Sequence, residues 1–282
     1  MLAERGQNCT LPCTSSSQWA RPIPFTQGDL GVRRLLALLM LCAAPCLATT
    51  ATLRIAVSES WSMPLMQLRD DRPVDGILFE VFQALAERTE VELEYHLMPR
   101  LRLQQAMLEG TVDLQCYVAP TWLEQIPPAY RWSVPLLIQR DVLVAAPGVA
   151  PSTTLAQLHQ ETVGAVLGFR YPALDTAWQS GELRREDSRN QLLVLQKLEA
   201  GRFRFAVSNQ LTLDWYNRQL PPEERLQALD VLEEDALGCL VRDDPRLPVR
   251  AVLAELKRMK RSGDIDRLIH RYLARTGSVR AD

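Results

Sequence analysis

The chain has 282 residues, of which 47% are hydrophobic and 23% charged, and its formal net charge is −2. This length can bury one large hydrophobic core or two modest ones. Acidic and basic residues are intermixed without a basic stripe, which argues against a surface that follows nucleic-acid phosphates. We therefore expect a globular protein without a nucleic-acid partner.

The N-terminal region carries a targeting signal. Arg33 and Arg34 precede an apolar run, Leu35–Ala44, and a Pro-Cys-Leu-Ala segment then ends at Ala48. A basic segment, a short apolar core and a small residue at the cleavage point are typical of a secretory signal peptide. The run is shorter than the roughly 20 apolar residues that span a bilayer. We predict that residues 1–48 are an upstream extension plus signal peptide and that the mature protein is periplasmic.

Two alternatives concern the same region. A lipoprotein leader attached at Cys42 or Cys46 would anchor the protein, but neither cysteine follows the Leu-small-small pattern of such leaders. Residues 1–31 are polar and lie upstream of a leader that normally begins within a few residues of the start. A start codon near Val32 would explain them.

Only Cys116 and Cys239 lie outside the removable region, and both fall in apolar, strand-like runs. Buried free thiols are the commoner state of such positions, so free thiols are expected and a disulfide is the alternative. The cysteine spacing fits no metal site, and we predict no metal and no cofactor.

Hydrophobic periodicity predicts alternating strands and helices in the first half of the mature chain. The expected elements are a strand at 53–57, a helix at 77–88, a strand at 91–97, a helix at 101–109 capped by Gly110, and a strand at 111–118. This order is the unit of an open parallel sheet.

An excursion rich in proline and aromatic residues follows the third strand. Tyr117 comes just before it, and Trp122, Tyr130 and Trp132 lie within it. Loops at strand ends are where ligands are usually held, and aromatic side chains offer them large rigid faces. We therefore place a ligand cleft at the end of the strand. The next apolar strand, 137–145, is predicted to cross into a second lobe.

The second half repeats the alternating pattern. The expected elements are a short helix through Leu158 capped by Ser152 or Thr153, a strand at 162–167, a helix from Tyr171 or Pro172, a helix at 192–200, a strand at 203–208, a helix to Arg218, a returning strand within 227–241, and helices at 248–261 and 264–275. Two α/β units with two crossings, near Leu143 and Cys239, follow from this order.

Over about residues 52–275 the chain resembles the periplasmic solute-binding proteins related to polar amino acid receptors of ABC transporters, solute-binding protein family 3. The resemblance rests on colinear short motifs: Trp61 with Pro64, Gly76 with the helix after it, EGTVDL at 109–114, WSVP at 132–135, TVGAVLG at 162–168, LEAGR at 198–202, and the end 256–272 with its Gly-Asp-Ile-Asp break. It implies a two-lobed α/β fold of the type II periplasmic binding proteins, with two crossing strands. The first lobe would be 52–142 and 241–275, and the second 143–240.

The resemblance also implies a ligand site between the lobes, from which the chain departs in its charged anchors. The residues expected to bind ligand are Trp61, Arg100, Tyr117, Thr121, Trp122, Arg170, Tyr171 and Asn209. Amino acid-binding members carry an Arg shortly after the position of Thr121, which clamps the ligand carboxylate; here Glu124 stands near that place. They also carry an Asp for the ligand ammonium where this chain has Asn209. Losing both anchors argues against an ordinary zwitterionic amino acid.

Two arginines stand instead at positions that the family places in the cleft. Arg100 takes the position of a stacking aromatic, and Arg170 lies at a helix N-terminus, where backbone donors favour an anion. The hypothesis is a small anionic or polar solute held by both. The alternatives are that Arg170 pairs with Asp175, that Arg100 is an exposed helix start, that Trp122 is a lobe-surface aromatic, and that Asn209 is only a helix N-cap.

The predicted function is capture of this solute by a monomer that presents its closed form to an ABC permease or a membrane sensor. The alternative is a periplasmic dehydratase-like enzyme on the same fold, with Glu124 or Asp113 as its acid. No nucleophile–histidine pair or metal-ligand cluster is evident among His96, His159 and His270, so no catalytic residues are predicted and the chain is expected not to be an enzyme.

Overall fold

The computed structural model describes residues 50–125 and 127–274. They belong to one compact unit, Thr50–Asp282. The predicted signal peptide, the start codon near Val32 and the alternative of a lipid anchor at Cys42 or Cys46 lie outside the described residues. No helix in the described part is both long and apolar enough to cross a membrane.

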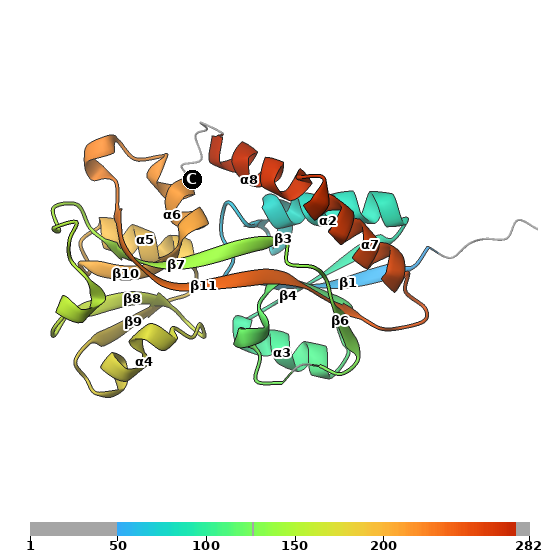
Figure 1. Ribbon diagram of the computed structural model, residues 1–282, viewed down its shortest axis with the longest axis horizontal. Helices are drawn as coiled ribbons and strands as arrows, with labels where there is room; N and C mark the ends of the chain where they lie inside the picture. Colours follow the sequence, from blue (N-terminus) through green and yellow to red (C-terminus); the bar gives the residue numbers. More distant parts are fainter. Residues whose placement is uncertain (1–49, 126, 275–282) are drawn as a thin grey trace, which may run out of the picture. The chain divides into compact units, whose positions relative to one another are not determined.

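The described chain is divided between two lobes, each an α/β layer structure (Figure 1). The first lobe contains β1 (Thr52–Ser58), β2 (Gln67–Arg69), β3 (Arg72–Asp75), α2 (Ile77–Thr89), β4 (Glu92–Met98), α3 (Arg100–Leu108), β5 (Leu114–Val118), η1 (Pro120–Trp122), β6 (Tyr130–Trp132), α7 (Val249–Arg261) and α8 (Asp264–Ala274). The second contains η2 (Leu155–Gln157), β8 (Thr162–Val166), α4 (Pro172–Gln179), β9 (Arg184–Ser188), α5 (Gln191–Glu199), β10 (Phe205–Asn209), α6 (Gln210–Asn217) and η3 (Pro222–Glu224).

Two long strands, β7 (Leu137–Ala145) and β11 (Gln227–Arg242), connect the lobes. They pair antiparallel from Leu137 opposite Leu237 to Ala145 opposite Gln227. At one end β11 continues alongside β5 of the first lobe, and at the other β7 continues alongside β10 of the second. Two crossing strands are thus present, and they bring residues about ninety positions apart in the sequence into register. The lobe boundaries given above stay a prediction.

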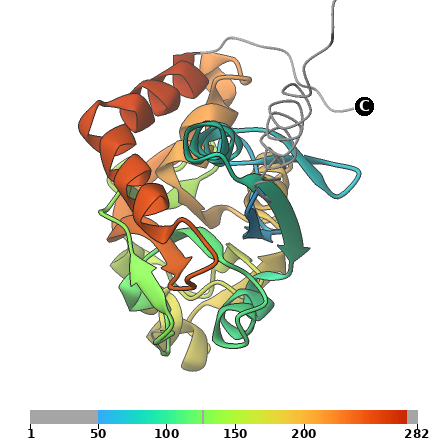
Figure 2. The ribbon, with the colours of Figure 1, turned by 90° about the vertical axis from the view of Figure 1, so that its right-hand side faces the viewer.

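Each lobe has helices on both faces of its part of the sheet. The path of strands is β4-β1-β5-β11-β7-β10-β8-β9, with β1, β4 and β5 parallel to one another and β8 parallel to both β9 and β10. In the first lobe, α2 and α7 share one core with the sheet and α3 packs in another. Figure 2 views the molecule from the side of the first lobe and shows α7, α8 and α2.

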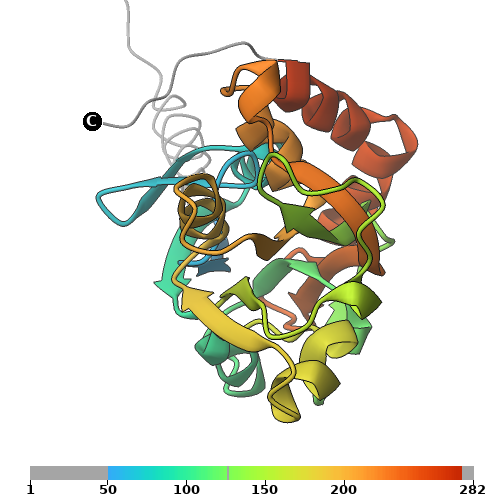
Figure 3. The ribbon, with the colours of Figure 1, turned by 90° about the vertical axis from the view of Figure 1, so that its left-hand side faces the viewer.

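The second lobe repeats this plan. Buried residues of α5 and α6 share one core, whereas α4 packs in a separate core that includes alternate residues of the same strands. Figure 3 views this lobe. In β10, for example, Ala206 belongs to the first of these cores and both Phe205 and Val207 to the second, as strand alternation requires. Helices on both faces therefore leave the carboxyl ends of the parallel strands as the free edge for a ligand.

Cys116 and Cys239 form a disulfide, which corrects the expectation of free thiols. Cys116 lies on β5 and Cys239 directly opposite it on β11, with 3.9 Å between their Cα atoms. The two sulfurs meet because the returning strand lies beside the strand that ends at the cleft. The disulfide ties β11 to the first lobe just beyond the crossing.

The predicted helix through Leu158 is a single 3-10 turn, and its cap is Thr154 rather than Ser152 or Thr153. The Thr154 side chain and Gln157 form a reciprocal capping box. Four short strands, β2, β3, β6 and β9, were not predicted. The sequence of β9, Arg-Arg-Glu-Asp-Ser, carries no apolar alternation because it is an edge strand.

Candidate functional site

A cavity of about 500 Å³ lies where the two lobes and the crossing strands meet. Its first-lobe lining comes from α3 and the segment after β5, and its second-lobe lining is Gly168, Phe169, Arg170 and Pro172. The crossing strands contribute Gln139, Asp141 and Glu233. The size is that of a site for a small organic molecule, and a molecule bound there would touch both lobes.

Arg100 forms part of the first-lobe wall. It is the first residue of α3, where a guanidinium can lie over the strand ends, and it is half-buried. Its guanidinium carbon lies 5.9 Å from the ring centroid of Phe169 on the second lobe. Burial lowers the pKa of Arg100, and no described carboxylate forms an ion pair with it. Within the part of the chain that the structure describes, Arg100 is therefore a cation without a counter-ion, in contact with the opposite lobe across the cavity.

Arg170 forms part of the second-lobe wall, two residues before the first residue of α4. It is exposed, and within the described residues it forms no hydrogen bond or ion pair. The alternative that it pairs with Asp175 is therefore not the arrangement seen. The two arginines approach the same cavity from opposite lobes.

Thr121 and Trp122 line the cavity from the 3-10 turn after β5, and both are held by one carboxylate. Thr121 Oγ1 donates to Asp235 Oδ1 at 2.7 Å, and Trp122 Nε1 donates to Asp235 Oδ2 at 2.8 Å. Asp235 lies on β11 and is 9% exposed. A charged acceptor on the crossing strand thus fixes the ring of Trp122 against the cavity.

Trp61 and Tyr117 do not line the cavity. Both belong to the first-lobe core, with their rings packed edge-on at 6.2 Å between centroids. Tyr117 has a positive φ of 59°. Its hydroxyl is buried without a hydrogen-bond partner in the described part, and burial, aided by the charge of Asp141, raises its pKa well above its ordinary value. A ligand role for these two residues stays a prediction.

Tyr171 and Asn209 also lie outside the cavity lining. Tyr171 is in the second-lobe core, where its hydroxyl accepts a hydrogen bond from the backbone of Val166 at 3.3 Å. Asn209 Oδ1 accepts from the backbone N–H of Thr212 at 2.8 Å. It therefore fills the N-cap role named as its alternative, and its ligand role likewise stays a prediction.

Sequence reasoning missed the polar residues of the crossing strands. Asp141 lies between Asn209 on β10 and Glu233 on β11, and it accepts a hydrogen bond at 2.9 Å from Gln139 Nε2. Burial raises the pKa of Asp141 to about 7, the Gln139 hydrogen bond opposes this, and the charges of Glu233 and Asp235 add to it. The available signal was the spacing of Gln139 and Asp141, two residues apart in one strand, which places both on one face of the sheet.

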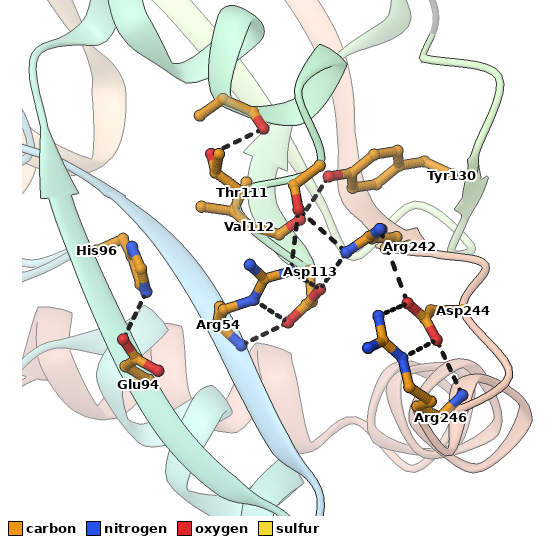
Figure 4. Close-up of polar contacts among 12 residues, drawn as sticks. Arg54, Glu94, His96, Thr111, Val112, Asp113, Tyr130, Arg242, Asp244 and Arg246 are labelled. Atoms are coloured by element: carbon orange, nitrogen blue, oxygen red, sulfur yellow. Dashed lines mark hydrogen bonds and ion pairs between the residues drawn. The ribbon is translucent and has the colours of Figure 1, made fainter.

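Asp113, one of the two nominated acids, lies away from the cavity in an ion-pair network (Figure 4). It is 3% exposed, and its oxygens accept from Arg54 at 2.6 and 2.8 Å and from Arg242 at 3.4 Å. Burial would raise its pKa, but hydrogen bonds from Arg54, the charge of Arg54 and a hydrogen bond from Arg242 hold the pKa below its ordinary value. Asp113 is therefore a structural carboxylate and not a proton donor at neutral pH.

Glu124, the other nominated acid, is exposed and lines the cavity, with its backbone N–H 3.5 Å from Gln104 Oε1. Among the described residues, no group of three or more His, Cys, Asp or Glu side chains is arranged to hold a metal ion.

The chain matches no protein-family model and no curated protein sequence. Its fold is similar to that of a variant of the arginine-binding protein ArgBP from T. maritima, with a TM-score of 0.63, 18% identity, and coverage of 80% of this chain and 96% of that one. The GluR0 ligand-binding core in complex with L-glutamate has a TM-score of 0.64 at 16% identity over 80% of this chain and 99% of that one.

A third similar structure is an ancestral amino acid-binding protein, AncCDT-1, described as a precursor of cyclohexadienyl dehydratase. Its TM-score is 0.63 at 17% identity, over 79% of this chain and 96% of that one. Sequence identities this low establish the fold alone. The chain thus has the two-lobed α/β fold of the type II periplasmic binding proteins, in agreement with the resemblance seen in its sequence.

Proposed function

We propose that the protein is an extracytoplasmic solute-binding protein that captures a small polar organic solute between its lobes. The observation that carries the proposal is the cavity of about 500 Å³ with lining residues from both lobes. A ligand can close two lobes only if it binds the closed arrangement better than the open one, which requires contacts on both sides. Arg100 and Arg170 supply such contacts for an acidic group of the solute, and Trp122 supplies an apolar face.

The proposed partner is an ABC permease or a membrane sensor that recognises the closed monomer. One similar structure is that of the substrate-binding protein of an amino acid ABC transporter, at 16% identity and a TM-score of 0.62. The contact of Arg100 with Phe169 joins the lobes across the cavity, and a ligand that bound beside it would stabilise the same closed arrangement. An exported protein reaches such a partner outside the inner membrane.

A dehydratase-like enzyme is the second candidate. It is supported by the similarity to AncCDT-1 and by Glu124 on the cavity lining. A general acid needs a raised pKa in a desolvated setting, and Glu124 is exposed. Turnover of a prephenate-like acid that is lost in Glu124→Gln would favour this candidate over solute capture.

The proposal is tested by titrating the mature protein with amino acids, small organic acids and polyamines, first by thermal shift and then by calorimetry. Arg170→Ala is expected to weaken binding of the best solute by at least about tenfold, because it removes a charge-assisted contact. The melting temperature should change by less than about 2 °C, since Arg170 has no partner among the described residues. Arg250→Ala, at an exposed position of α7, is the matched control.

The opposite result, in which Arg170→Ala lowers the melting temperature and leaves affinity unchanged, would make Arg170 a structural residue. Absence of any saturable binding across the whole panel would overturn solute capture itself.

A further inference from the structure

The crossing strands supply Gln139, Asp141 and Glu233 to the cavity lining, and this part of the lining is called the floor below. Two of the three residues are carboxylates on neighbouring strands. Asp141 on β7 and Glu233 on β11 are register partners in the antiparallel pair, and both line the cavity. Like charges directly opposite each other destabilise a sheet unless something neutralises them. Among the described residues, no Lys, Arg or His forms an ion pair with either carboxylate. Burial, together with nearby acidic groups, raises the pKa of both.

Gln139 adds an unsatisfied acceptor to the same floor. It is 6% exposed, and its amide N–H₂ is turned to Asp141, because a carboxylate can only accept. Its Oε1 is consequently left buried without a hydrogen-bond partner in the described part of the chain. A buried acceptor without a donor raises the free energy of the folded protein, so a ligand that donates a hydrogen bond to Gln139 Oε1 would be favoured at this site.

Two side-chain donors of the cavity lining are already engaged. The hydroxyl of Thr121 and the indole N–H of Trp122 both donate to Asp235. The floor therefore offers acceptors and negative charge, whereas Arg100 and Arg170 on the walls offer donors and positive charge.

We propose that Gln139, Asp141 and Glu233 form a subsite for a cationic nitrogen group of the bound solute. The solute is then dipolar, with an ammonium or guanidinium at the crossing strands and an acidic group toward Arg100 and Arg170. This inference rests on the proposed function, because it names the chemical class of the captured solute. A nitrogen cation carries several N–H donors and no acceptor, which is the complement of this floor.

The position of Asp141 explains how the chain can bind a cation without an acid at Asn209. Asn209 is engaged as the N-cap of α6, and its register partner on β7 is Asp141. The negative charge is thus supplied from the adjacent strand. That strand connects both lobes, so a cation bound to it would lie at the axis of closure rather than on one lobe.

Affinity for a nitrogen cation should rise with pH. The groups that act on the pKa of Asp141 are Glu233 and Asp235 of β11 and Gln139 of its own strand. Tyr117 on β5 and Tyr171, just before α4, also interact with it electrostatically. None of these is a cation, and no described Lys, Arg or His forms an ion pair with Asp141. A proton on Asp141 competes with the ligand cation, so binding strengthens as Asp141 ionises.

The test uses β-alanine, 4-aminobutyrate, 5-aminopentanoate and the common L-amino acids, each beside the acid of the same skeleton without its nitrogen. Calorimetry at pH 8 is expected to show at least one dipolar solute binding at least about tenfold more tightly than its nitrogen-free counterpart. Asp141→Asn should remove most of that difference and leave the affinity for the nitrogen-free acid unchanged. Glu234→Gln is the control, because Glu234 is exposed and pairs with Arg140 on the other face of the sheet.

Glu233→Gln provides a second variant if Asp141→Asn is not folded by circular dichroism, and it should lower the same preference. Equal affinity for both members of every pair, unchanged in both variants, would overturn the cationic subsite while leaving solute capture intact. Failure of the wild-type protein to bind any member of this panel would overturn the dipolar solute, and solute capture itself would be overturned if the small organic acids and polyamines of the wider panel did not bind either.

Discussion

Asp113 is buried just before β5 and Asp141 is half-buried on β7, and the surroundings of the two carboxylates are opposite. Asp113 is held by Arg54 and Arg242, with the backbone N–H of residue 54 donating to it as well. Asp141 has one amide donor and two acidic neighbours. The pKa of the first is lowered and that of the second is raised to about 7. A carboxylate whose charge is satisfied by its own chain contributes to the fold, whereas one left unsatisfied in a cavity is available to a ligand.

The largest expected effect on stability comes from removing an ion-pair partner of Asp113. Arg54→Met leaves Asp113 buried with Arg242 and the backbone N–H of residue 54 as its remaining partners, and the free energy of unfolding should fall by about 3–5 kcal/mol. Urea unfolding at pH 7 measures this. Arg140→Met is the matched control, because its exposed pair with Glu234 should contribute less than about 1 kcal/mol. Similar losses in the two variants would contradict the assigned role of Asp113.

The second prediction concerns the pH dependence of stability at the unsatisfied site. Because the folded-state pKa of Asp141 is about 7 and the unfolded value is 3.8, the folded protein binds more protons between these pH values. Asp141 therefore makes the ligand-free protein progressively less stable as pH rises from about 4 to about 7. Asp141→Asn removes this penalty, so its stability relative to wild type should increase over that window by a few kcal/mol at most.

The measurement is thermal unfolding of both proteins without solute at a series of pH values. A constant difference between wild type and Asp141→Asn at all pH values would show that Asp141 titrates normally.

The third prediction concerns a variant in which Asp141 gains a cationic partner, as Asp113 has in Arg54 and Arg242. Glu233→Lys places a cation opposite Asp141 on β11, where it can take the position proposed for the ligand nitrogen. We expect a change in unfolding free energy below about 1 kcal/mol, because the new ion pair offsets the cost of burying the longer side chain. Binding of dipolar solutes should nevertheless be lost. Retained binding in Glu233→Lys, measured by the same calorimetry, would place the ligand cation elsewhere.

Local sequence patterns were sufficient to predict many of the strands and helices. The strand 137–145 was predicted with the bounds of β7, because it is an apolar run between turn residues. The helix predicted at 77–88 corresponds to α2, because its apolar residues recur with helical spacing. In contrast, the residues of β9 are all polar, so nothing in its composition separates it from a loop.

The site was harder to predict because its chemistry depends on strand register. Arg100, Thr121, Trp122 and Arg170 line the cavity, and their binding of a ligand stays a prediction. Asp141 faces Glu233 across two paired strands, and Cys116 is bonded to Cys239. In both pairs the two residues are about a hundred positions apart in the sequence. Such pairs become visible only when the returning strand is placed beside its partner, and a shift of one residue would turn Glu233 to the opposite face.

The most direct test of this account is an NMR titration of the aspartate side-chain carboxyl carbons, with and without the tightest-binding dipolar solute. The account predicts that Asp141 titrates near pH 7 in the free protein and at a clearly lower pH when the solute is bound, while Asp113 stays ionised throughout. An Asp141 that titrates at the ordinary value of an aspartate in the free protein, or whose titration is unaffected by the solute, would contradict it.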